Sequence, residues 1–268
     1  MLSFNLLGRL GRLGNQMFQY AVLLAEARRL SLPHCIPDSS GIVADQQHQL
    51  LEAFMLPELV ILGRQRAPQC LTLPIDNGWE PGWNDKVGAG CDLVGFFQSE
   101  RFFEGHEAAV RAAFAFNETR RRRCEAALAR MGPAVIALHV RRTDYLANAH
   151  RFPPCSPSYF AAALETMPAN LPVLVFSDDV AWCRAQPLFA SRRFMFSKSG
   201  SNLDDLCLMT LCRHHIISNS SFSWWGAWLA LHPRQQVVAP LHWFGAAASP
   251  AKRINVAPSH WCRLPNQA

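Results

Sequence analysis

The chain has 268 residues and half of them are hydrophobic, so it can bury one large core or two smaller ones. Its 26 lysines and arginines exceed its 20 aspartates and glutamates, which gives a formal net charge of +6 at pH 7. This mild excess suits an anionic ligand without requiring nucleic acid. The densest basic run, Arg120 to Arg123, has no interleaved aromatic residues, which favours a solvated helix start over a nucleic-acid patch.

Nine cysteines are scattered along the chain without a Cys-x-x-Cys pair. We therefore expect neither a disulfide framework nor a zinc site, and a reducing cytosol is the default compartment. Cys207 and Cys212 are expected in the core with their helix. The N-terminus lacks a basic flank followed by a long apolar core, and no apolar stretch approaches the ~18 residues that span a bilayer. These features predict a cytoplasmic protein, with peripheral membrane contact left open.

The chain opens with a predicted short strand over Phe4 to Leu7, followed by a glycine-rich turn. Every third residue from 8 to 14 is glycine, a spacing that differs from the dinucleotide fingerprint and from a Walker A loop. From Met17 the apolar residues follow a helical period. The turn would bring Asn15 and Gln16 to a helix start, where exposed amides favour an oxygen-rich ligand. The alternative is a tight turn without a ligand.

Residues 35–95 are rich in proline, glycine and glutamine, and they predict loops with short helices. Another strand is expected over Leu93 to Phe97. Regular α/β alternation begins after Gly132-Pro133, so we expect a domain boundary there. The N-terminal domain would then span residues 1–132 and the C-terminal domain residues 133–268.

The second half of the chain alternates between predicted strands and helices. This alternation predicts an α/β fold with a parallel sheet and helices on both faces. A helix is expected to begin at Ser156-Pro157, because proline is favoured at the first helical position. Ser201 and Asp204 would form a capping box for a later helix. The remaining expected elements are strands at 134–138, 173–176, 216–217 and 237–239 and helices at 203–211 and 224–231.

The segment from His139 to Tyr145 follows directly on the predicted strand 134–138. In open α/β sheets, ligands bind beyond the carboxyl ends of the strands. Arg141 and Arg142 at such a point are costly unless an anion meets them, and guanidinium geometry suits phosphate oxygens. The alternative is that both arginines form ion pairs with nearby carboxylates, Asp144 being the obvious partner.

Two further polar segments, 177–179 and 218–223, also follow predicted strands. Because the carboxyl ends of parallel strands meet at one edge of a sheet, the three segments predict a single ligand site. The serines of 218–223 exceed what helix capping needs and suit a diphosphate. Asp178 and Asp179 have a plainer alternative as helix-capping carboxylates. They do not form Asp-x-Asp, so the sequence gives little support to a metal-binding site.

Other motif-like residues have structural interpretations as well. Asp204 and Asp205 lie in a predicted first helical turn, where acids are favoured electrostatically, or one of them accepts hydrogen bonds from a nucleotide base. The tryptophans of 224–228 are expected in the core. His214 and His215 begin a strand and point to opposite faces, which favours a structural role.

Five segments together resemble motifs of the bacterial α-1,2-fucosyltransferase family, in the family's order and over nearly the whole chain. The resemblance implies a GT-B-like fold with two Rossmann-like halves, with the acceptor side in residues 1–132 and the donor site at the strand carboxyl ends of residues 133–268. It also implies inverting, metal-independent transfer of L-fucose from GDP-β-L-fucose to a hydroxyl of a galactose-containing oligosaccharide, with an α-1,2 linkage. Arg12 replaces a glycine common in the family, as in protein O-fucosyltransferases. The segments are Gly11 to Ala21, Gly95 to Phe103, His139 to Tyr145, Phe176 to Asp179 and His214 to Leu229.

The resemblance implies that Arg141 contacts the β-phosphate of the donor and that His139 and Asp205 lie near guanine. It also implies that residues 218–223, which we call the serine block, lie near the phosphates. No cofactor is expected beside the donor substrate. The alternatives are another GDP-sugar, another acceptor including protein, or a non-catalytic nucleotide- or glycan-binding protein. The expected catalytic residues are Arg141, Asp144 and Asn15; the expected donor-binding residues are His139, Arg142, Asp178, Asp205, Asn219, Ser220, Ser221, Phe222, Ser223, Gly14 and Gln16.

Overall fold

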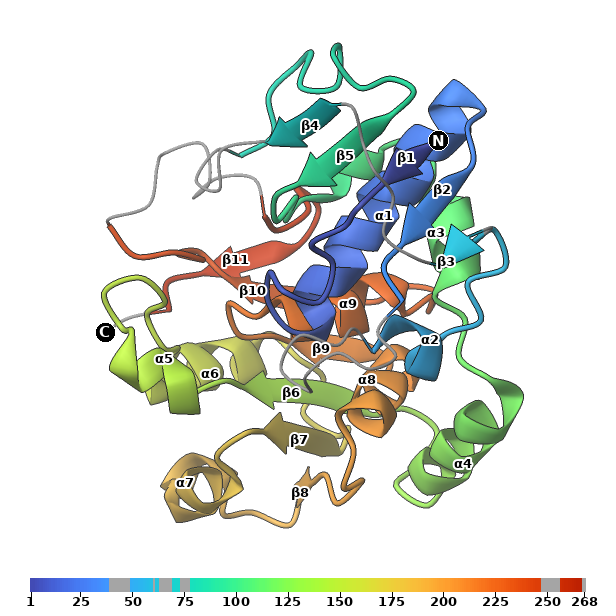
Figure 1. Cartoon of the computed structure of the whole chain (residues 1–268). Coiled ribbons are helices and arrows are strands. Elements are labelled where there is room, and N and C mark those ends of the chain that lie inside the picture. The colour runs from blue at the N-terminus through green and yellow to red at the C-terminus, as the bar shows by residue number, and fades with distance from the viewer. Residues whose placement is uncertain (39–48, 60, 63–68, 73–77, 247–255, 267–268) are drawn as a thin grey trace. The chain divides into compact units, whose positions relative to one another are not determined.

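A computed structural model describes residues 1–38, 49–59, 61–62, 69–72, 78–246 and 256–266. The described residues divide into two compact units, one up to Asn117 together with Val256 and the other from Glu118 onward. Each unit contains a sheet whose neighbouring strands run parallel (Figure 1). The predicted α/β fold with parallel sheets is therefore confirmed.

The sheet of the first unit has the strand order β3-β2-β1-β5-β4 among the described residues. The prediction of loops with short helices over residues 35–95 is met by the short helix α2 and the loops around 54–59 and 78–90, but it missed the strands in this region. They have only two to four residues each, too few to show a period. The elements are β1 (Leu2–Ser3), α1 (Leu13–Leu30), β2 (His34–Ile36), α2 (Leu50–Ala53), β3 (Ile61–Leu62), β4 (Gln69–Thr72), β5 (Cys91–Val94), η2 (Glu100–Phe103) and α3 (Glu107–Ala113).

The predicted first strand, Phe4 to Leu7, was wrong. The chain leaves the sheet after Ser3 and turns. The buried carboxylate of Asp92 on β5 explains the turn, because its Oδ1 accepts hydrogen bonds from Ser3 Oγ at 2.7 Å and from the backbone N–H of Asn5 at 2.8 Å. The strand that was expected over 93–97 ends earlier, and Phe97 has a φ of 52°, outside the extended region.

The sheet of the second unit has the order β11-β10-β9-β6-β7-β8, so β6 lies between β9 and β7. The short outer strands β8 and β11 were not predicted. The elements are α4 (Glu118–Ala129), β6 (Ile136–Val140), α5 (Thr143–Ala147), α6 (Pro157–Glu165), β7 (Val173–Ser177), α7 (Val180–Ala185), η3 (Pro187–Phe189), β8 (Phe194–Phe196), α8 (Asn202–Leu211), β9 (His214–Ile216), α9 (Ser221–Leu229), β10 (Val237–Pro240) and β11 (Cys262–Leu264).

The division between the units comes before the boundary expected at Gly132-Pro133. Helix α4 lies with the second unit because it packs against α8. Arg120 Nε lies 2.9 Å from Asp204 Oδ1, and Arg123 also pairs with this carboxylate. Cys124 on α4 is buried. Two arginines of the basic run thus fasten α4 to α8, whereas Arg121 and Arg122 are exposed at the start of α4, as expected for a solvated helix start.

The core of the second unit confirms several expectations. Helix α6 begins at Pro157, and the Ser156 side chain accepts a hydrogen bond from Tyr159 N at 3.2 Å. Trp224 and Trp225 are fully buried, as are the two cysteines of the α8 region, Cys207 and Cys212. His214 and His215 are also buried. Both accept or donate hydrogen bonds within the fold, the first with Gln236 N and the second with Met209 O.

Within the described ranges, no helix is long and apolar enough to cross a membrane.

Candidate functional site

The three polar segments predicted to share a site all follow neighbouring strands of the second unit. Strands β9, β6 and β7 are adjacent and parallel, so segments 218–223, 139–145 and 177–179 leave the sheet at one edge (Figure 1). Strand β8 runs parallel to β7, and it brings the loop before α8 to the same edge. The carboxyl edge of this sheet is thus the candidate site.

Arg141 follows β6 and is held by two carboxylates. Its Nη2 lies 2.5 Å from Asp144 Oδ1, and its Nη1 lies 3.0 Å from Asp178 Oδ2. Its backbone N–H donates to Ser218 Oγ at 3.2 Å. Only 17% of the side chain is exposed, so the guanidinium is fixed in place before any ligand arrives.

Arg142 has different partners. Its Nε lies 3.3 Å from Asp179 Oδ2, and its guanidinium carbon lies 3.8 Å from the centre of the Trp182 ring. Both arginines thus form ion pairs with nearby carboxylates, as the alternative interpretation expected, and Asp144 is a partner of Arg141 alone. Asp179 also caps α7 as predicted, because its Oδ1 accepts from Trp182 N at 3.0 Å. This double contact fixes the second arginine beside the first.

Asp178 braces the loop that carries the arginines rather than capping its own helix. Its carboxylate accepts hydrogen bonds from Arg142 N at 2.9 Å, from Thr143 N at 3.2 Å and from Thr143 Oγ1. Burial alone would raise the pKa of Asp178, but the hydrogen bond from Thr143 and the charge of Arg141 outweigh it and hold this pKa below its usual value. The carboxylate therefore stays ionised beneath Arg141.

The serine block joins two strand ends and opens a helix. Ser218 Oγ donates to His139 O at 2.7 Å. Asn219 is buried, and its Nδ2 donates to Pro153 O and Trp243 O, both at 3.0 Å. Ser220 and Ser223 are also buried, whereas Ser221 and Phe222 are half-buried in the first turn of α9. Backbone N–H groups of a first turn have no acceptor within the helix, so this turn can bind an anion.

His139 is buried beside this turn. Its ring centre lies 5.9 Å from that of Phe222, and its Nδ1 has no hydrogen-bond partner among the described residues. Burial, followed by the charge of Arg141, lowers the pKa of His139 to about 3. The imidazole is therefore neutral at physiological pH, and its Nδ1 is a buried polar atom whose hydrogen bond is unmade among the described residues, which is uncommon in folded proteins.

From the lowered pKa values of the buried histidines we predict how the free energy of unfolding depends on pH. Burial also lowers the pKa of His215 to about 4, whereas an unfolded histidine titrates near 6.5. The unfolded chain therefore binds protons first, and stability is lost as pH falls below about 6.5, by up to about 1.4 kcal/mol per pH unit for each such histidine. Urea denaturation at pH 7 and pH 5 should show a smaller acid loss in His215→Gln than in wild type. The exposed His260 provides the control variant His260→Gln, and equal losses in all three proteins would contradict the assignment.

Asp205 lies in the first turn of α8 with one carboxylate oxygen bound and the other open. Its Oδ1 accepts from Ser199 Oγ at 2.7 Å and from Ser197 Oγ, and no described residue bonds to Oδ2. Burial raises the pKa of Asp205, against the lowering effect of the two serines. The neighbouring Asp204 faces Arg120 and Arg123 instead. The predicted capping box is therefore only half formed, since Ser201 caps α8 without Asp204.

The remaining predicted residues, Gly14, Asn15 and Gln16, lie in the first turn of α1 in the first unit. This helix begins at Leu13, before the expected start at Met17. Gln16 is buried: its Nε2 donates to Gly11 O at 3.3 Å, and its Oε1 accepts from Gln49 N at 3.0 Å. Gly14 is buried as well, whereas Asn15 is half-buried. Of the three, Asn15 presents its side chain best to a ligand.

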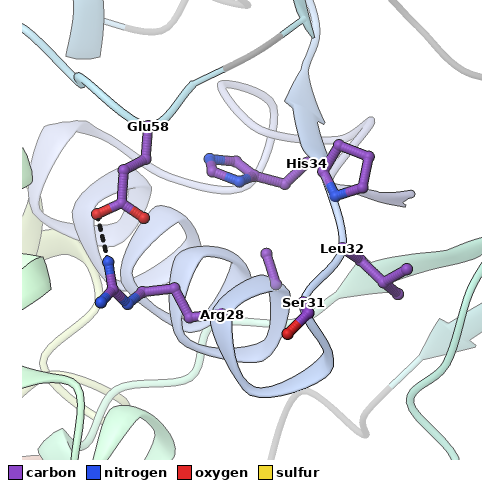
Figure 2. A pocket seen from close by; sticks show the side chains of 7 residues that line it. Arg28, Ser31, Leu32, His34 and Glu58 are labelled. Carbon is purple, nitrogen blue, oxygen red and sulfur yellow. Dashed lines mark hydrogen bonds and ion pairs between the residues drawn. The ribbon is translucent and has the colours of Figure 1, made fainter.

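A cavity of about 230 Å³ in the first unit is lined by none of the predicted site residues. It lies at the C-terminal end of α1, where Arg28 and Glu58 form an ion pair of 2.6 Å (Figure 2). His34, the first residue of β2, also lines it. The cavity is thus at the amino edge of its sheet, opposite the edge at which ligands bind in such folds.

Sequence reasoning missed the residues that support the site. Thr143 binds Asp178, Ser197 and Ser199 bind Asp205, and Gln98 binds Asn15. The two serines follow β8, so recognising that strand would have placed them at the carboxyl edge. Across the described ranges, no group of three or more His, Cys, Asp or Glu is arranged to hold a metal ion.

Two fucosyltransferases of known structure share the fold. One is POFUT1 in complex with GDP-fucose, at 11% identity, with 89% of this chain and 97% of that chain covered and a TM-score of 0.59. The other is NodZ α-1,6-fucosyltransferase with GDP, at 14% identity, with 84% and 90% covered and a TM-score of 0.54. The GT-B-like α/β fold is thereby confirmed.

Sequence comparison gives the family. The chain is 27% identical to an α-1,2-colitosyltransferase of Escherichia coli, over 95% of this chain and 96% of that protein. It is 28% identical to the O-antigen biosynthesis glycosyltransferase WbnK of the same species, over 87% and 93%. It is 27% identical to the bovine galactoside 2-alpha-L-fucosyltransferase SEC1, over 82% and 62%. The sequence model of glycosyl transferase family 11 matches residues 85–251, more than half of the chain. The chain therefore belongs to glycosyl transferase family 11.

Proposed function

We propose that this protein is an inverting α-1,2-fucosyltransferase that moves L-fucose from GDP-β-L-fucose to a hydroxyl of a galactoside. The observation that carries the proposal is the pair Arg141 and Arg142, fixed beyond β6 and beside the first turn of α9. Two guanidinium groups and a helix N-terminus suit a diphosphate. Relatives named as α-1,2-colitosyl- and galactoside α-1,2-fucosyltransferases support the linkage and the acceptor.

In this proposal the reaction depends on charge stabilisation at the departing nucleotide. As the bond between sugar C1 and the phosphate oxygen breaks, negative charge grows on the diphosphate. Arg141 is already oriented by Asp144 and Asp178, so it meets that charge without reorganising, and such preorganised groups usually contribute most to the rate enhancement. The acceptor hydroxyl attacks C1 and loses its proton to Asp144, a more distant carboxylate or a phosphate oxygen of the donor.

The rest of the donor has partners on the same edge. Phosphate oxygens would accept from the first-turn N–H groups of α9 and from the hydroxyl of the half-buried Ser221, with Phe222 beside them. The buried Ser220 and Ser223 would hold the shape of the turn. Guanine would bind the open Oδ2 of Asp205, and the unpartnered Nδ1 of His139 would take a further polar contact. Asn219, whose amide is already bonded, would hold the shape of the loop.

Activity is expected to survive saturating EDTA. The positive charge that a glycosyltransferase needs at the diphosphate is supplied here by Arg141 and Arg142, so no metal is required in the proposed mechanism. The measurement is the initial rate of transfer with and without chelator, followed by re-addition of Mg²⁺ or Mn²⁺. If EDTA abolished turnover and a metal restored it, Asp178 and Asp179 would become the leading ligand candidates.

The decisive experiment is transfer from labelled GDP-fucose to an array of galactosides, with linkage analysis of the product. We expect an α-1,2-fucosylated galactoside, no transfer from GDP-mannose and loss of product with Arg141→Ala. GDP-L-colitose should be compared in the same assay, because a relative that covers 95% of this chain is named a colitosyltransferase and colitose is fucose without its 3-hydroxyl. A higher kcat/KM for GDP-colitose than for GDP-fucose would mean that colitose, not fucose, is the sugar transferred. Nucleotide binding without turnover on any acceptor would contradict the proposal.

A further inference from the structure

The side chain of Asn15 has a fixed partner on another loop of the first unit. Asn15 lies in the first turn of α1, and its Oδ1 accepts a hydrogen bond of 2.6 Å from Gln98 Nε2. Gln98 lies in the loop that follows β5. Strand β5 runs parallel to β1 in the same sheet. The loops after these two strands therefore meet at the carboxyl edge, with the two carboxamides joined between them.

Gly11 shapes the other side of the same carboxamide. Its φ is +93°, and a Cβ placed on it would lie only 2.1 Å from Asn15 Nδ2 and 2.9 Å from Asn15 Cγ. Any other residue at this position would therefore collide with the Asn15 side chain, besides adopting a backbone conformation that glycine favours. The Nδ2 of Asn15 lies over this glycine, and no described residue accepts a hydrogen bond from it.

Two buried glutamines of α1 hold the loops that touch Asn15. Gln19 is fully buried, and its Nε2 donates to Leu10 O at 3.0 Å and to Gly95 O at 3.2 Å. Gln16 Nε2 donates to Gly11 O at 3.3 Å. The helix that carries Asn15 thus fixes both loops that orient it. A carboxamide held in this way is preorganised, because its oxygen is engaged and only its N–H groups are left to bind a ligand.

We propose that Gly11 and Gln98 are positioning residues of the transfer reaction. Gln98 holds the side-chain oxygen of Asn15, and Gly11 leaves room for the Asn15 Nδ2 because it has no Cβ. The two N–H bonds of Asn15 Nδ2 then donate to one hydroxyl of the acceptor sugar. Such a donor orients the hydroxyl oxygen without taking its proton. The inference rests on the proposed function, in which the acceptor is a sugar, and on the catalytic role that the sequence predicts for Asn15.

A pair of glycine variants tests the role of Gly11. Gly105 has a φ of +81°, and a Cβ added to it would have no atom within 4 Å, so Gly105→Ala carries the backbone strain without the collision. We expect Gly11→Ala to lower kcat/KM for the acceptor at least tenfold and Gly105→Ala to change it less than twofold. GDP affinity, measured by calorimetry, should be unchanged in both. Equal losses in the two variants would overturn the role of Gly11.

A second pair tests Gln98. In Gln98→Glu the carboxylate can only accept, so it would capture the Asn15 N–H groups, whereas Gln98→Met has similar size and captures nothing. We expect the glutamate variant to lose more of kcat than the methionine variant, with GDP affinity unchanged. Equal rates in the two variants would show that Gln98 does not act through the Asn15 amide.

An NMR readout separates this inference from the proposed function. The side-chain NH₂ signals of Asn15, assigned by their loss in Asn15→Asp, should move in Gly11→Ala and Gln98→Glu but not in Gly105→Ala. They should also shift on titration with methyl β-galactoside. If wild type transferred no fucose but these signals behaved as expected, only the proposed donor or reaction would fail. Unmoved Asn15 signals would overturn the positioning role whatever the activity.

Discussion

Replacing Arg141 by alanine is expected to lower the rate of fucosyl transfer by at least ~10²-fold, the scale for losing one preorganised stabiliser of developing negative charge. The variant removes the guanidinium that joins Asp144 and Asp178 at the end of β6. The measurement is kcat with GDP-fucose and a galactoside at saturation. Near-normal turnover would remove Arg141 from the mechanism and leave the fold unaffected.

Arg141→Lys should also be impaired, because an ammonium group lacks the planar fork that reaches two carboxylates at once. The exposed Arg213 supplies a control, since Arg213→Ala removes the same charge outside the candidate site. Thermal melting of all three variants separates loss of catalysis from loss of folding. A lysine variant as active as wild type would mean that charge alone, without the fork, is sufficient.

Replacing Asp205 by alanine is expected to weaken GDP binding by roughly ten- to a hundredfold, since a hydrogen bond to a charged group contributes about 1.5–3 kcal/mol. The open Oδ2 of Asp205 can accept from the N1–H and the amino group of guanine, whereas adenine presents an acceptor at N1. The variant should therefore also discriminate less between GDP and ADP. Calorimetric titration of both nucleotides measures both effects.

The adjacent carboxylate gives a matched control for this prediction. Asp204 pairs with Arg120 and Arg123 of α4, so Asp204→Ala should lower the melting temperature and leave GDP affinity unchanged. Two neighbouring positions of one helix are thus expected to give opposite results: Asp205→Ala loses GDP affinity, and Asp204→Ala loses thermal stability. Unchanged GDP affinity in Asp205→Ala would return that residue to a structural role with Ser197 and Ser199.

The location of the candidate site could be predicted from sequence because it depends on local patterns. Apolar runs such as 134–138 and 173–176 are long enough to show buried strands. Polar residues that follow parallel strands must lie at the same edge, and β9, β6 and β7 are indeed neighbours. The adjacency of those strands brings Arg141, Asp178 and the serine block together.

Pairings between distant residues could not be predicted in the same way. Asp144 is the nearest carboxylate to both arginines in sequence, but Arg142 pairs with Asp179, which follows the neighbouring strand β7. Asp204 has the spacing of a capping box, yet Arg123, 81 positions away, binds it more strongly than a backbone N–H would. Such partners depend on how elements pack against one another, and the hydrophobic pattern of a single segment does not show which other segment it packs against. Strands of two or three residues, such as β1 and β8, could not be predicted for a simpler reason: they are too short to repeat the two-residue period of a strand.

Every contact described for Arg141 and Asp205 comes from within the second unit, from α5, the loop after β7, the serine block and the loop before α8. If the second unit binds the donor, as proposed, and the first unit binds the acceptor, as the resemblance implies, mutation could remodel the first unit without rebuilding the arginine site. Such independence would give a lineage of transferases a route to new glycans that preserves a shared activated sugar. Chimeras that exchange the first unit would then be a natural design for new linkages.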